Sequence, residues 1–77
     1  MNIKKLKTIY SKIEGLKADL EEIHEKATET FENRSDKWRD SDAGQNEEQR
    51  ISHLEEAISE IDSLLENLDN AAYDENA

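Results

Sequence analysis

Cysteine and proline are absent from this 77-residue sequence, and glycine occurs only twice. The missing cysteine excludes disulfide bonds and cysteine-ligated zinc. Strand-forming residues are also scarce, because valine does not occur and aromatic residues make up only 5% of the chain. The residues that remain are rich in the helix formers Glu, Lys, Leu and Ala. The composition therefore predicts an all-α protein.

Long hydrophobic runs are missing as well. No apolar stretch approaches the roughly 20 residues that a membrane helix needs. The basic start, Met1 to Leu6, is not followed by the apolar stretch of a secretory signal. We therefore expect a cytoplasmic protein with no membrane partner. Hydrophobic residues make up 34% of the chain and charged residues 39%, a balance that permits a thin seam between helices but no thick core.

The formal net charge of −10 limits the partners that the chain can bind. A strongly acidic chain is repelled by bare nucleic acid and by anionic lipid. We expect its partners to be basic protein surfaces or further copies of the chain.

Heptad spacing predicts a first amphipathic helix from about residue 3 to about residue 33, or on to about residue 39. With Leu6 at position a, two apolar lines form a coiled-coil stripe. Position a holds Leu6, Ile13, Leu20 and Ala27, and position d holds Ile9, Leu16, Ile23 and Thr30. Position e adds a third line, Ile3, Tyr10, His24, Phe31 and Trp38, which only Lys17 interrupts. So wide an apolar face suits a helical bundle better than a two-stranded coil.

A second amphipathic helix is predicted from about residue 42 to about residue 72. With Ile51 at position a, its lines are Ile51, Ile58, Leu65 and Ala72 at a, Leu54, Ile61 and Leu68 at d, and Ala57, Leu64 and Ala71 at g. The break between the helices is expected at residues 40–42, where Asp40, Ser41 and Asp42 are all candidate N-caps. Asp42 and Gln45 have capping-box spacing. Residues 73–77 are expected to form a frayed acidic tail.

The short break predicts that the two helices are antiparallel neighbours in a single helical-hairpin domain. Charge supports this arrangement, because a lysine-rich start would lie beside an acidic end. The lysines are Lys4, Lys5, Lys7, Lys12 and Lys17, and the stretch from Glu60 to Glu75 carries six acids and no base. Since two helices leave the wide apolar faces half covered, we expect a homodimer that forms a four-helix bundle.

Catalytic and metal-binding patterns find little support in the sequence. Glu21 and His24 have the Glu-x-x-His spacing of di-iron bundles, but Glu21 falls at position b, away from the seam, and none of the a and d residues named above is a carboxylate. His53 is expected at the surface. The serines lack a nucleophile elbow, and no phosphate-binding loop occurs. We expect no enzyme activity, no cofactor and no metal, with a metal-binding bundle as a minor alternative.

The break contains the most specific residue, Trp38, which Lys37 and Arg39 flank and which Arg34 precedes. Trp38 is interpreted first as a plug that closes the apolar seam at the turn. The alternative is a binding anchor, formed with Arg34 and Arg39, because Trp and Arg are enriched in binding hot spots.

Acidic residues on the second helix suggest a sharper function. Carboxylates along a rigid rod can imitate the phosphates of DNA, which carries one charge per about 1.7 Å. The acids that line the second helix are Glu47, Glu48, Glu55, Glu56, Glu60, Asp62, Glu66 and Asp69, and the candidate binding residues among them are Glu55, Glu56, Glu60 and Asp62. The simpler interpretation is a solvated acidic helix face.

The turn and the second helix carry a recognisable pattern. It reads Phe31-x-x-Arg34-Ser35-Asp36-Lys37-Trp38-x-Asp40-Ser41-Asp42-x-Gly44, followed by Leu54-Glu55-Glu56-Ala57. From Phe31 to Leu68 it resembles a group of small uncharacterised proteins from phages and other mobile elements. The resemblance implies no activity and no functional residue, but it makes an inhibitor of a host protein more plausible.

Two functions therefore remain open. The first is a non-enzymatic interaction module, an acidic helical hairpin that self-associates and binds a protein partner. The second is a phage-type inhibitor that mimics nucleic acid and occupies a basic nucleic-acid-binding protein.

Overall fold

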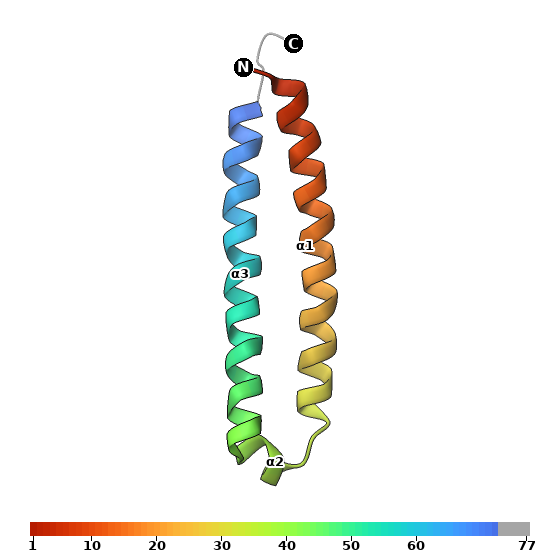
Figure 1. The fold of residues 1–77 in the computed structure, drawn as a ribbon, viewed down its shortest axis with the longest axis vertical. Coiled ribbons are helices and arrows are strands. Elements are labelled where there is room, and N and C mark those ends of the chain that lie inside the picture. The colour runs from red at the N-terminus through yellow and green to blue at the C-terminus, as the bar shows by residue number, and fades with distance from the viewer. Residues whose placement is uncertain (73–77) are drawn as a thin grey trace.

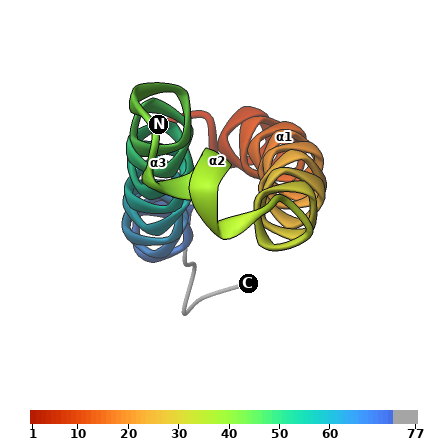
Figure 2. The ribbon, with the colours of Figure 1, turned by 90° about the horizontal axis from the view of Figure 1, so that it is seen from below.

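Two long helices run side by side in opposite directions in a computed structural model that describes residues 1–72 (Figure 1). Helix α1 spans Ile3–Glu32, the short α2 spans Asp36–Asp40, and α3 spans Asp42–Ala72. Seen from below, α2 bridges the adjacent ends of α1 and α3 (Figure 2). The predicted all-α fold, with two long helices that contact each other, is confirmed. The expected acidic tail lies outside the described residues.

The first helix ends at Glu32, which agrees with the shorter predicted end near residue 33, and the extension to residue 39 is wrong. The N–H groups of Asn33 and Arg34 still donate to the carbonyls of Glu29 and Phe31, at 3.1 and 3.2 Å, which closes the last turn. Ser35 then leaves the helical conformation, and its Oγ accepts the N–H of Trp38 at 3.2 Å. Serine competes for backbone hydrogen bonds in a helix interior and is favoured at an N-cap, so a new helix begins here.

The start of α3 is capped by Ser41. Its Oγ accepts the N–H of Gly44 at 3.3 Å and donates to the carbonyl of Trp38. The expected capping box of Asp42 and Gln45 is therefore wrong, because the amide of Gln45 donates instead to the carbonyl of Asp40, at 3.3 Å. One serine hydroxyl thus connects the end of α2 to the beginning of α3.

The seam that α3 contributes is confirmed. All seven predicted a and d residues, from Ile51 to Ala72, are half-buried or buried. Glu47 and Gly44 continue the same spacing toward the turn. Within residues 1–72 only Gly44, Leu65 and Ala72 are buried, so the contact between the helices is a thin stripe.

The seam that α1 contributes differs from the prediction. Its a line lies inside as expected, but its second inner line is e, from Ile3 through Tyr10, Lys17 and His24 to Phe31. The predicted d line, Ile9, Leu16, Ile23 and Thr30, is exposed. Lines a and e together have the alternating three- and four-residue spacing that a coiled-coil seam requires. Helix α1 is therefore rotated toward its e line, and three large apolar side chains face outward.

Candidate interaction surface

The exposed apolar side chains form a line along α1. Ile9, Leu16 and Ile23 are 37%, 61% and 57% exposed, and each directly precedes a seam residue. On α3, Leu64 is 45% exposed and directly precedes the buried Leu65. Ala57 and Ala71 hold the same position one heptad before and after Leu64.

These two lines lie on one side of the hairpin. An antiparallel helix pair has an approximate twofold axis perpendicular to the plane of the two helices, which keeps equivalent seam-flanking positions on the same side. Ile9, Leu16 and Ile23 are equivalent in this sense to Ala57, Leu64 and Ala71. We call the surface formed by these six residues the apolar side.

The opposite side of the hairpin carries a large share of the acids. On α3, four carboxylates follow seam residues at heptad spacing: Glu48, Glu55, Asp62 and Asp69. The equivalent line of α1 contains Glu14 and Glu21, with Lys7 as its one basic residue. We call the surface of these six acids the acidic side. None of the six residues of the apolar side carries a charge, so the two sides differ sharply in chemistry.

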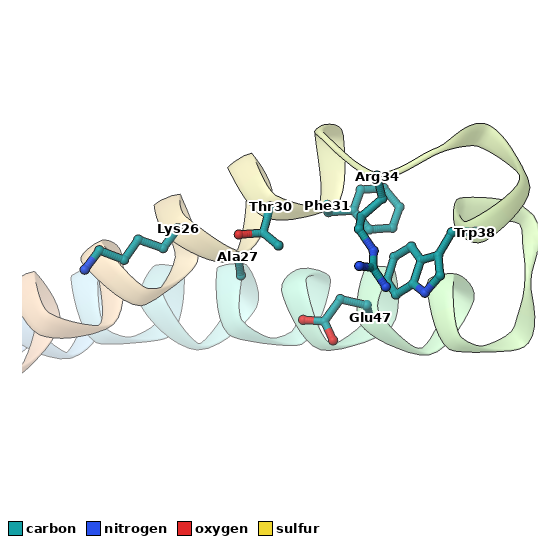
Figure 3. Close-up of a pocket in the computed structure, with 7 residues that line it drawn as sticks. All are labelled: Lys26, Ala27, Thr30, Phe31, Arg34, Trp38 and Glu47. Atoms are coloured by element: carbon teal, nitrogen blue, oxygen red, sulfur yellow. The ribbon is translucent and has the colours of Figure 1, made fainter.

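A hollow of about 430 Å³ continues the apolar side at the turn (Figure 3). It is lined by Lys26, Ala27, Thr30, Phe31, Arg34, Trp38 and Glu47. The guanidinium carbon of Arg34 lies 4.0 Å from the centroid of the Trp38 ring. The Phe31 ring meets Trp38 edge to face, with centroids 6.1 Å apart and planes at 67°. Trp38 is half-buried between these two side chains and the turn.

The predicted turn residues therefore separate into two groups. Arg34 and Trp38 come together, whereas Arg39 forms an ion pair with Asp36 on its own short helix. Arg39 lines a second, shallower hollow with Phe31 and Glu48, the latter a residue of the acidic side. Arg34 thus lies toward the apolar side of the molecule and Arg39 toward the acidic side.

The four predicted acidic residues do not gather in one patch. Glu55 and Asp62 lie on the acidic side. Glu55 lies 3.9 Å from His24, and Asp62 forms an ion pair with Lys17. Glu56 lies 3.8 Å from His53 on the outer surface of α3. Glu60 follows a third line, the one that borders the apolar side.

Only part of the expected lysine-to-acid contact forms. Among residues 1–72, the ion pair of Lys17 with Asp62 is the one that joins the lysine-rich start to α3. The other four lysines are exposed, because they occupy neither inner line of α1. Asp74 and Glu75 lie outside the described residues.

Replacing Lys17 with leucine is expected to raise the thermal midpoint. Lys17 occupies a seam position, and a lysine there specifies the alignment of two helices at a cost in stability. Its hydrogen bond to Asp62 raises the pKa of Lys17 above the ordinary value. This stabilising contribution is present below the ordinary lysine pKa of about 10.4 and disappears as the pH rises through the raised value. Circular-dichroism melts between about pH 9 and pH 12 should show a steeper loss for the wild type than for Lys17→Leu. Equal losses would contradict a stabilising role for the ion pair.

Metal and membrane sites find no counterpart in residues 1–72. No cluster of three or more His, Asp or Glu side chains in this part could hold a metal ion. No helix in the same part is both long enough and apolar enough to cross a bilayer. Comparison with known proteins adds no relative: no family model, curated protein or solved structure matches the chain.

Proposed function

We propose that the chain is a non-enzymatic interaction module that self-associates through its apolar side into a four-helix bundle. One observation carries the proposal: the exposed large side chains Ile9, Leu16, Ile23 and Leu64 share one side of a hairpin whose own seam does not use them. Large apolar side chains that stay exposed on one side of a small protein are typical of protein–protein contacts.

The dimensions of the hairpin allow a dimer through the side that carries these residues. Helix α3 has 31 residues, which corresponds to a length of about 46 Å at a rise of 1.5 Å per residue. Two adjacent helices, each about 10 Å wide, present a face of about 900 Å². Stable protein interfaces bury about 800 Å² on each partner.

The charge distribution supports the same surface. A chain with a net charge of −10 repels its own copies wherever acids would meet. Contact through the apolar side leaves the six carboxylates of the acidic side in solvent, where they keep the assembly soluble and remain accessible to a basic protein partner. The mimicry alternative has less support, because Glu55, Glu56, Glu60 and Asp62 follow three different lines of α3.

A Leu16→Glu variant tests the proposal. We expect wild-type protein to have about twice the monomer mass of 8.9 kDa in light scattering. Each Leu16 buried in a dimer contributes about 1.5–3 kcal/mol. Losing two of them should weaken the dissociation constant by at least about 100-fold. The helical circular-dichroism spectrum should persist, since Leu16 lies outside the seam.

Ala18→Glu is the matched control, because it adds the same charge to an exposed position of α1 outside the apolar side. It should remain dimeric at concentrations where Leu16→Glu is monomeric. A wild type that keeps the monomer mass at millimolar concentration would refute self-association. Equal weakening by both variants would refute the apolar side as its surface.

A further inference from the structure

The apolar side has large residues on α1 and mostly small residues on α3. Leu16 and Leu64 flank the cross-helix pair of Lys17 and Asp62, so they lie at one level of the hairpin. One heptad toward the turn, Ile23 lies level with Ala57, beside the contact of His24 with Glu55.

One heptad in the other direction, Ile9 lies level with Ala71. The three levels are therefore an Ile–Ala pair, a Leu–Leu pair and a second Ile–Ala pair. This pattern restricts how a second copy can fit, because closely packed interfaces place large side chains against small ones.

Two hairpins that meet through the same side have two symmetric arrangements. In the first, α1 lies on α1 of the partner and the turns point to opposite ends. At full overlap, Ile9 then meets Ile23 and Leu16 meets Leu16 along α1, while Ala57 faces Ala71 on both sides of a Leu64–Leu64 contact along α3. This arrangement overpacks one half of the interface and leaves voids in the other, and both defects are destabilising.

In the second arrangement, α1 lies on α3 of the partner and both turns are at the same end. Ile9 of one copy then meets Ala71 of the other, Ile23 meets Ala57, and Leu16 meets Leu64 between them. Every level combines large and small residues or two leucines, so the interface fills evenly. We propose that the dimer has this arrangement, with both Trp38 turns together. The inference rests on the proposed self-association and specifies the partner as a second copy in one orientation.

Spin-label distances test the orientation. The chain has no cysteine, so Lys37→Cys gives a single labelling site on the exposed surface of α2. Double electron–electron resonance between nitroxides in two copies should give a distance below about 30 Å if the turns are together. Turns at opposite ends would be separated by about 45 Å, the length of a 30-residue helix.

Lys4→Cys, at the start of α1 and far from the turn, provides a second labelling site. A short distance at both sites supports the proposed arrangement. A long distance at both sites overturns it while leaving self-association intact. Absence of any intermolecular dipolar signal refutes self-association, and with it this inference. Adding Leu16→Glu to the Lys37→Cys chain should abolish the signal, and a signal that survives would overturn the assignment to the apolar side.

Discussion

Replacing Gly44 with alanine is expected to destabilise the hairpin by about 1–3 kcal/mol, the range for overpacking a close contact. A Cβ at this position would overlap the carbonyl oxygens of Trp38 and Arg39 and would lie 2.6 Å from the Arg39 Cα. These atoms belong to the backbone of α2 and cannot move as a flexible side chain can. The expected sign is opposite to that of helix propensity, which favours alanine over glycine by about 1 kcal/mol.

Gly15→Ala provides the control, because a Cβ there has nothing within 4 Å. It should stabilise the protein by about 0.5–1 kcal/mol. Both variants can be compared by urea unfolding. Using one protein concentration keeps any contribution of self-association to the measured stability the same for both. If Gly44→Ala stabilises the chain as much as Gly15→Ala, the close packing of α2 on α3 is wrong.

Leu65→Ala is expected to have the largest effect on stability. Leu65 is 7% exposed and is the most buried large apolar side chain within residues 1–72. Truncating a buried leucine costs about 2–5 kcal/mol. A chain of this size has a total stability of roughly 4–11 kcal/mol, so the variant should lose a large fraction of it and show a clearly lower urea midpoint.

The neighbouring Leu64→Ala is the matched comparison for Leu65→Ala. The same atoms are removed, but Leu64 is 45% exposed. Measured in the Leu16→Glu background, where self-association is expected to be lost, Leu64→Ala should cost less than about 1 kcal/mol, as surface substitutions do. Similar losses for the two variants would mean that α3 is rotated relative to the seam described here.

The seam of α3 was predictable because α3 has only two continuous lines of large apolar residues. Ile51, Leu54, Ile58, Ile61 and Leu65 alternate at spacings of three and four, and no competing line has comparable volume. A single orientation toward α1 therefore buries the most apolar surface.

Helix α1 carries three apolar lines, and its orientation was not predictable from its own residues. Lines a and d have better apolar composition, because line e contains Lys17 and His24. Line e nevertheless faces α3, where Asp62 pairs with Lys17 and Glu55 lies near His24. Two lines together fill the narrow seam, and the third must face outward.

The position of the turn depended on tertiary contacts that spacing alone does not encode. Ser35, Asp40, Ser41 and Asp42 are all good N-cap residues. Ser35 and Ser41 act as caps because Gly44 lets the backbone of α2 lie directly on α3. The tight approach selects two caps from four equivalent candidates.

This construction of the turn also governs chain exchange. A two-helix hairpin can open into one long rod and pair with another open chain, which produces a domain-swapped dimer. Straightening the connection here would break both serine caps and separate α2 from Gly44, all in one step. Helix α2 is thus expected to keep each chain folded back on itself, so that the proposed dimer would form from two intact hairpins and not by exchange of helices.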